Sequence, residues 1–379
     1  MGPGTGSRNA RGSTQPTAAH VGDGTTCCLR LGGGRNSRSF AVGCGVQQGC
    51  PASNPLFNLF INRVLTETLQ ATEGCGVRIQ YRLDGQLHKQ RLRAGAAVPT
   101  QLVSALMLAD DIILIADSHE QLQSLTTALH RSCQRWRLCI NTTKTHHLVV
   151  LPRGAEAQAQ LAAQEQPPLM LGGEPVGRVK KLEYLGSTFC ESGSIDADIS
   201  ARLSKAGFAS EQLGRIWRLR SVPLATKMEI FRYSVLATLL YGSHAWAPSK
   251  EQEAGLHVFY MRCLRRLLGV SKLDCLRNEE ILRRCNMQPM DVLLRQQRMR
   301  WLGHSFRMPD ERLPKQLLWA QRPGTRPRGK SPKRWREDTA SQDVRSMGLA
   351  NSWQRGAQHR AAWHQASKGE KVNPRGLPR

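Results

Sequence analysis

The first clear hydrophobic pattern along the chain is a helical one that follows Asn54 and Pro55. Apolar residues recur there at three- and four-residue spacing: Leu56, Phe57, Phe60, Ile61, Val64 and Leu65. Proline suits the first turn of a helix, where its missing N–H is not needed. The pattern therefore predicts a helix that begins near Pro55.

Two short apolar runs come next, at 104–109 and 112–116, and Asp110 and Asp111 separate them. Apolar runs on either side of a polar pair are typical of a β-hairpin. We therefore predict two strands with the acidic pair at the turn.

Helical signals dominate the rest of the chain. A capping-box pattern at 118–121 precedes apolar residues at helical spacing over 122–136, and the apolar run 148–151 predicts a strand. Beyond Ile195 the pattern becomes helical, with Gly269 as a C-terminal cap. The clearest of these helical segments are 224–241, 251–268 and 290–303.

Composition indicates a folded protein that binds a polyanion. The 379 residues are 40% hydrophobic and carry a formal net charge of +25. No apolar run approaches the roughly 20 residues of a membrane-spanning helix, and the first residues lack the apolar stretch of a secretory signal. We expect a protein of the nucleus, the cytoplasm or both, neither secreted nor in a membrane.

The positive charge belongs to the second half of the chain. Residues 1–200 hold 19 basic and 15 acidic residues, whereas 201–379 hold 35 and 14. This excess favours phosphate contacts, and the densest basic run is broken by Pro and Gly, unlike a membrane-binding helix. The residues of this run that we expect to bind nucleic acid are Arg326, Arg328, Lys330, Lys333, Arg334 and Arg336. Phosphate contacts are also favoured for Arg295, Arg298 and Arg300 on the 290–303 helix, the alternative being a charged outer face.

The pair Asp110 and Asp111 is the sharpest chemical signal. Adjacent carboxylates repel each other, and a divalent cation such as Mg²⁺ relieves the repulsion. Asp is also a common turn residue, so the pair alone leaves both interpretations open. A metal site of this kind needs a third carboxylate from another strand.

Two further segments suit phosphate chemistry. The loop 45–53 places two glycines and a proline before the first helix, which allows close approach of backbone to a nucleotide or template. Lys144 follows a strand and a polar turn, where its charge could neutralise a phosphate. Each segment alone is equally compatible with an ordinary turn or an exposed lysine.

Together and in this order, these segments resemble the reverse transcriptase of non-LTR (LINE-type) retrotransposons. GVQQGCPASNPLFNLFIN resembles the family's template and nucleotide loop with its helix, LMLADDIILIAD its metal-binding hairpin, LCINTTKT its lysine motif and LEYLG its primer grip. The helical region, with YGSHAW and RWLGH, resembles the thumb and C-terminal parts. The resemblance implies that Asp110 and Asp111 bind Mg²⁺ and that Lys144 serves the leaving pyrophosphate. It also implies a nucleotide and template site at Gln48, Gly49, Pro51 and Ser53, and a primer grip at Tyr184, Leu185 and Gly186.

The sequence departs from the family pattern in one important respect. The family's third metal-binding Asp precedes the glycine loop, whereas the only acid before Gly45 here is Asp23, in a setting unlike the family's Asp-bearing strand. We therefore expect an N-terminally truncated reverse transcriptase in which the fingers and the first Asp motif are missing, with an incomplete Mg²⁺ site.

The expected fold class is α+β, a partial antiparallel palm with helices followed by an all-helical region. The expected divisions are a flexible leader (1–39), a partial palm (40–190), a helical thumb (191–289) and a basic helical C-terminal region (290–379). The expected function is that of an RNA-directed DNA polymerase, a nucleotidyltransferase acting on an RNA template and a DNA primer, impaired by the missing Asp. The alternative is a non-catalytic RNA- or DNA-binding remnant or domesticated derivative. Oligomeric state is left open.

Overall fold

The fold is described from a computed structural model. The described residues are 50–81, 99–151, 167–321, 333–349 and 353–368, together with the backbone of three short strands at 17–20, 26–30 and 40–41. Most of the segment expected as a leader lies outside them. Within it, β1 (Thr17–His20) and β2 (Thr26–Arg30) form an antiparallel sheet that β3 (Phe40–Ala41) extends.

Two helices and a hairpin form the core of the palm region. Helix α1 (Ser53–Gln70) packs on α2 (His119–Arg135), and both cover one face of the hairpin β6 (Ala105–Leu108) and β7 (Asp111–Leu114). The helices and hairpin appear where the periodicity predicts them. The Ser118 hydroxyl caps α2 by accepting a hydrogen bond from a backbone N–H, as the sequence predicts.

A strand from the far end of the chain joins the palm region. Strand β4 (Val77–Tyr81) pairs antiparallel with β5 (Thr100–Val103) on one side and with β14 (Ala320–Gln321) on the other. The amide of Gln316 also donates a hydrogen bond of 3.2 Å to the Tyr81 hydroxyl. The C-terminal region is therefore docked directly on the palm region.

The remaining strands are short, and one prediction about them is wrong. Residues 148–151 form no strand: in the described part of the chain the ladder before them stops at β8 (His146–His147), parallel to β11 (Gly177–Arg178), and Leu151 makes only a single backbone hydrogen bond, to Glu191. An apolar run becomes a strand only where a partner edge is available. Two further antiparallel pairs complete the sheets: β9 (Met170–Leu171) with β10 (Glu174–Pro175), and β12 (Lys181–Tyr184) with β13 (Ser187–Cys190).

Helices form most of the described residues after Cys190, as predicted. The helical module consists of α4 (Asp196–Gln212), α5 (Gly214–Arg218), α6 (Leu224–Phe231), α7 (Ala237–Leu240), α8 (Lys250–Leu268) and α9 (Asn278–Cys285). A π-helical turn, Arg232–Leu236, joins α6 to α7. The core of the helical module includes the fully buried Phe231, Tyr260 and Leu264. Gly269 ends α8 in the left-handed conformation, which confirms the predicted cap.

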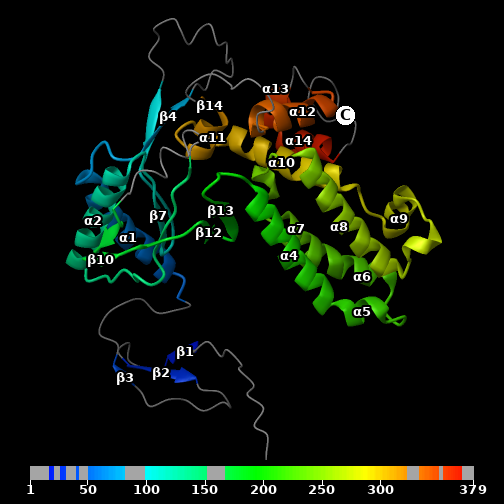
Figure 1. Cartoon of the computed structure of the whole chain (residues 1–379), viewed down its shortest axis with the longest axis horizontal. Helices are drawn as coiled ribbons and strands as arrows, with labels where there is room; N and C mark the ends of the chain where they lie inside the picture. Colours follow the sequence, from blue (N-terminus) through cyan, green and yellow to red (C-terminus); the bar gives the residue numbers. More distant parts are fainter. Residues whose placement is uncertain are drawn as a thin grey trace, which may run out of the picture.

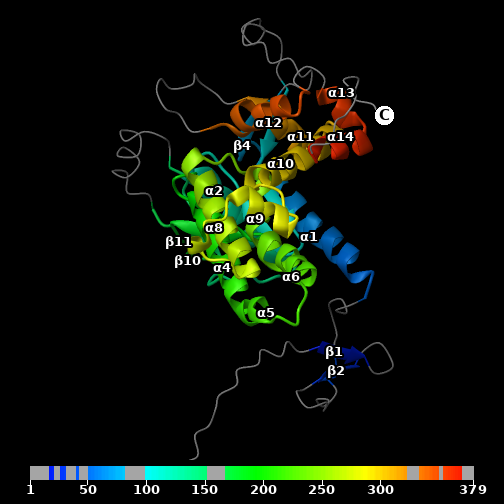
Figure 2. The same cartoon turned by 90° about the vertical axis from the view of Figure 1, so that its right-hand side faces the viewer.

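Helix α10 (Met290–Arg307) joins this module to a second core. Met290 and Leu294 belong to the core of the helical module, whereas Met299 and Leu302 belong to the C-terminal one. The other C-terminal elements are α11 (Leu313–Leu318), the π-helix η5 (Trp335–Ala340), α12 (Ser341–Ser346), α13 (Trp353–Gln358) and α14 (Arg360–Ser367). In two perpendicular views, α12–α14 lie at the top and α10 runs between them and the helical module (Figure 1, Figure 2).

The expected fold class is confirmed: short, mainly antiparallel strands with two palm helices precede a helical region. Within the described stretches, no helix combines the length and the apolar character that crossing a membrane requires.

Candidate functional site

The acidic pair lies at the tip of the β6–β7 hairpin. Leu108 pairs with Asp111, and Ala109 and Asp110 form the two-residue turn between the strands. Ala109 has φ 54°, a left-handed conformation that costs an L-residue about 1–2 kcal/mol. Asp110 and Asp111 are both exposed. The hairpin therefore presents two carboxylates to solvent while its opposite face packs on α1 and α2.

These two carboxylates do not make a complete metal site. No group of three His, Cys, Asp or Glu side chains that could hold an ion occurs within the described ranges. A divalent ion in a transferase site is normally held by more carboxylates than a turn of two can bring to one point. The described donor set therefore does not fit a complete magnesium centre.

The segment predicted to be a primer grip, here called the grip hairpin, is a second hairpin, β12–β13, with Leu185 and Gly186 at its turn. Their φ angles are 47° and 77°, and a tight turn with positive φ at both central positions matches the twist of a hairpin. Leu is an unusual residue there, because a left-handed conformation is strained for a branched side chain. Strain of this kind persists only where neighbouring residues hold it in place.

Two residues of the helical module hold this turn. The Tyr241 hydroxyl donates a 2.9 Å hydrogen bond to the backbone oxygen of Leu185, and the Arg202 guanidinium donates to that of Gly186. Arg202 also stacks 4.4 Å from the centre of the Tyr241 ring. The conformation of the grip turn is thus tied to α4 and to the end of α7.

Asp198, on the first turn of α4, fixes the base of the same hairpin. Its carboxylate accepts a hydrogen bond of 2.9 Å from the Thr188 backbone N–H and one of 2.8 Å from the Trp246 indole. Asp198 is only 6% exposed. Sequence reasoning missed this residue, whose only signal was an acid at the start of a helix.

The two hairpins are linked electrostatically. Burial raises the pKa of the Tyr184 phenol, and the negative charge of Asp111 raises that pKa further. A charge has this effect only at short range. The end of β12 therefore lies within electrostatic range of the start of β7.

Lys144 occupies a turn that the Asn141 side chain organises. The Asn141 carboxamide oxygen accepts hydrogen bonds from the Lys144 backbone N–H, at 3.1 Å, and from the Thr143 hydroxyl, at 2.7 Å. Lys144 is exposed, and in the described stretches no ion pair or hydrogen bond joins it to Asp110 or Asp111. Its predicted role stays a prediction.

The predicted nucleotide loop is only partly described. Gln48 and Gly49 lie outside the described residues, whereas Pro51 is exposed in the turn before α1 and Ser53 is the buried first residue of that helix. Hydrogen bonds from the Ala52 backbone and the Ser53 side chain lower the pKa of the exposed Cys50 thiol. The loop thus enters the helix through a polar turn.

The basic run is described only from Lys333 onwards; Arg326, Arg328 and Lys330 lie outside the described residues. Lys333 lies 3.8 Å from Glu253, and Arg334 pairs with Glu337 at 2.9 Å. Arg336 donates a 2.8 Å hydrogen bond to the backbone oxygen of Leu318 and lies over the Trp319 ring. This geometry favours a packing role for Arg336.

The expectation of phosphate contacts is wrong for Arg298. This side chain is 4% exposed and forms a bidentate ion pair with Asp343, at 2.5 and 3.0 Å. Helix α10 packs on the helical module and on the C-terminal core, so the Arg298 guanidinium is buried. The charge pattern of a single helix does not show which of its faces are covered.

Comparison with known proteins indicates the same family as the sequence motifs. Residues 14–189 match the family model of the reverse transcriptase (RNA-dependent DNA polymerase), including part of the segment expected as a leader. Over 159 residues the chain is 25% identical to a retrovirus-related Pol polyprotein from the type-1 retrotransposable element R2 of Nasonia vitripennis, covering 41% of this chain and 13% of that protein. Over 275 residues it is 26% identical to a putative uncharacterized transposon-derived protein of Caenorhabditis elegans, covering 68% of this chain and 92% of that protein.

The chain therefore contains a segment, residues 14–189, that matches a reverse transcriptase domain. It is related to the Pol polyprotein of a non-LTR retrotransposon and to a transposon-derived protein. The matched family generally uses a divalent metal and acts on nucleic acid.

Proposed function

We propose that this protein binds an RNA template paired with a DNA primer, and that the primer end lies between the β12–β13 hairpin and the acidic β6–β7 hairpin. The observation that carries the proposal is that the charge of Asp111 adds to the raised pKa of the Tyr184 phenol. It joins the motif that resembles a primer grip to the motif that resembles a metal-binding turn.

The surface of the grip supports this proposal. Leu185, Phe189 and Tyr241 are 42%, 49% and 53% exposed, so an apolar strip lies on the hairpin and on the tyrosine that holds it. Exposed aromatic side chains are platforms on which bases and sugars stack. Contact with the end of a nucleic-acid duplex would remove this apolar surface from water.

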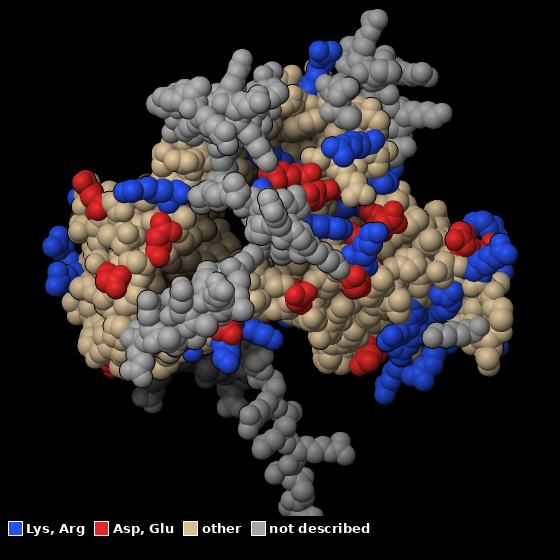
Figure 3. All heavy atoms as spheres, turned by 45° about the horizontal axis from the view of Figure 1, so that its top comes forward, with Lys and Arg blue, Asp and Glu red and all other residues tan. Residues whose placement is uncertain are grey.

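The charge of the helical module supplies the phosphate contacts. Arg215, Arg220 and Arg262 are exposed, and none forms an ion pair with another described residue. Lys and Arg side chains gather over the helical module, whereas the palm side mixes both signs (Figure 3). Each arginine that meets a phosphate releases counterions, which strengthens binding at low salt.

RNA-directed DNA polymerisation is the second candidate function. The exposed carboxylates beside the grip favour it, since Asp110 and Asp111 are two oxygen ligands of the kind that Mg²⁺ prefers. The proposed contacts of Gln48, Gly49, Pro51 and Ser53 with the nucleotide and of Lys144 with the pyrophosphate rest on the family resemblance. Because the described residues supply no third carboxylate, binding is the function that they support best.

One experiment separates the two functions. Binding of a labelled primer–template is measured by fluorescence anisotropy over a salt series, and primer extension is measured in the same samples with Mg²⁺. We expect salt-dependent binding that the Asp111→Asn variant retains and that the Arg215→Gln/Arg220→Gln/Arg262→Gln variant loses by about tenfold or more at low salt. In the matched control the same kind of replacement is made at Arg283 and Arg284, which are paired with Glu280.

The outcome of each assay is decisive. Extension by the unmodified chain that disappears in Asp111→Asn would establish the polymerase. Equal losses in the triple variant and in the control would contradict the proposed phosphate contacts.

A further inference from the structure

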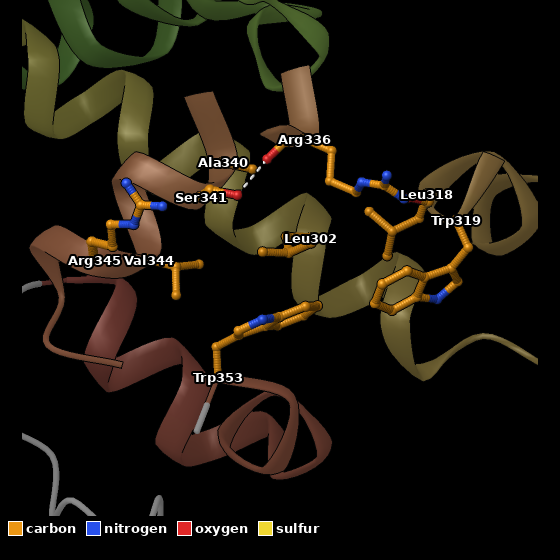
Figure 4. Close-up of a pocket in the computed structure, with 9 residues that line it drawn as sticks. All are labelled: Leu302, Leu318, Trp319, Arg336, Ala340, Ser341, Val344, Arg345 and Trp353. Carbon is orange, nitrogen blue, oxygen red and sulfur yellow. Dashed lines mark hydrogen bonds between the residues drawn. The ribbon is translucent and has the colours of Figure 1, made fainter. Parts of the chain in front are cut away.

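A cavity of about 140 Å³ opens in the C-terminal core, between α10, α11 and α12. Its walls are Leu302, Leu318, Val344 and Ala340 together with the tryptophans Trp319 and Trp353. In the close-up, Trp353 forms one side of the space, Val344 lies on the α12 side and Leu302 lies behind them (Figure 4). The cavity exceeds the roughly 30 Å³ that one water occupies and is smaller than a site for a whole drug-sized ligand.

The rim of this cavity is positively charged. Arg336 lies beside Trp319, and Arg345 lies at the opposite rim on α12 (Figure 4). The carboxylate nearest to Arg336 is that of Glu337, at 3.8 Å, the outer limit of an ion pair. Arg345 has no ion pair with a described residue, because Asp343 on the same helix is taken by Arg298. The Arg345 guanidinium is therefore available to an anion, whereas that of Arg336 is held by the Leu318 backbone oxygen and the Trp319 ring.

The Arg336 charge is also poorly solvated. Burial lowers the pKa of this guanidinium, and the charge of Arg334 lowers it further, against the opposing effect of Glu337. The Leu318 backbone oxygen and the Trp319 ring hold this charge in place and keep the rim positive. Aromatic walls beside such a charge suit a flat ring that carries a phosphate.

We propose that this cavity binds one unpaired nucleotide of a single-stranded nucleic acid, with the base against Trp353 and the phosphate at Arg345. Arginine matches phosphate through several N–H donors, and base stacking on an aromatic ring is tolerant of sequence. The site is separate from the grip hairpin, so it would hold a strand that is not part of the primer duplex.

The test uses the full chain and a single-stranded oligoadenylate RNA that carries one 2-aminopurine. Stacking on an indole quenches this base, so fluorescence reports entry into the cavity and anisotropy reports affinity. Two variants perturb the site: Ala340→Leu fills the cavity with apolar atoms, and Arg345→Ala removes an exposed rim charge. Arg355→Ala on α13 is the matched control, because Arg355 is also exposed and unpaired but does not line the cavity.

We expect binding to quench the base and both site variants to weaken affinity at least about fivefold, with the control changing it less than twofold. The same variants should bind the primer–template duplex as tightly as the unmodified chain, which separates this site from the proposed grip. Equal effects of Arg345→Ala and Arg355→Ala, or unquenched binding, would overturn the proposal. If Ala340→Leu does not unfold cooperatively, the comparison of Arg345→Ala with Arg355→Ala decides alone.

Discussion

The negative charge of Asp111 acts on the phenol of Tyr184, 73 positions later in the chain. This relationship joins the tips of two hairpins that the sequence presents as separate motifs. It also makes the arrangement of the candidate site measurable without any activity assay.

Neutralising Asp111 should lower the pKa of Tyr184 towards the ordinary tyrosine value. The Asp111→Asn variant removes the charge that stabilises the protonated phenol, whereas burial continues to raise the pKa. The ring resonances of the five tyrosines are followed by NMR against pH. Asp117→Asn, an exposed acid beyond β7, is the control. An unchanged Tyr184 titration in Asp111→Asn would show that the two hairpins do not lie within electrostatic range of each other.

Replacing Asp198 with Ala should destabilise the fold and loosen the grip hairpin. The variant leaves the Thr188 N–H and the buried Trp246 indole without their acceptor. An unsatisfied buried donor costs about 1–3 kcal/mol of unfolding free energy. Urea denaturation measures the loss, with the exposed Glu211→Ala as the control. Equal stability of the two variants would mean that Asp198 does not hold this junction.

Removing one partner of the buried ion pair of Arg298 with Asp343 should lower the free energy of unfolding strongly, whereas replacing both partners with apolar residues should lower it little. Arg298→Met alone leaves an uncompensated carboxylate and should cost about 3–5 kcal/mol of unfolding free energy. The double variant Arg298→Met/Asp343→Leu should recover most of that loss, because no charge remains buried. Thermal or urea unfolding of the two variants checks this. Additive losses in the double variant would show that the pair is not coupled.

Stability should fall as the pH is lowered below neutrality, partly through His147. Burial lowers the pKa of this imidazole, and the charges of His119 and Arg178 lower it further. The unfolded chain, with a histidine pKa of about 6.5, then binds the proton before the folded chain does, so protonation favours unfolding. The contribution of neutral His147 to the free energy of unfolding is complete above about pH 6.5. It is lost as the pH falls from about 6.5 to the lower pKa of His147 in the folded chain. The free energy of unfolding should therefore drop less steeply in His147→Gln, and identical slopes would contradict this role.

The sequence predicts the elements whose signals are local. The Ser118 cap, the helix after Pro55 and the Gly269 cap each depend on residues within a few positions, and each is present in the structure. The strand predicted over 148–151 is absent, because strand formation depends on a partner that the run itself does not specify.

The contacts that organise the candidate site are long-range ones. Asp198 and Trp246 are separated by 48 positions, and Arg298 and Asp343 by 45. The charge of Arg298 predicted solvent or phosphate contacts, whereas tertiary packing buries it. Motif order was therefore enough to predict the family, but not which charged residues serve the core.

The most direct test of the proposed function is to find where the primer end lies. A primer with a 4-thiothymidine at its 3′ end, paired to an RNA template, is photocrosslinked to the full chain, and the modified peptides are identified by mass spectrometry. We expect crosslinks in the β12–β13 hairpin, at or near Tyr184 to Phe189, because the proposal places the primer end between this hairpin and the acidic turn. Crosslinks confined to other parts of the chain would contradict the account.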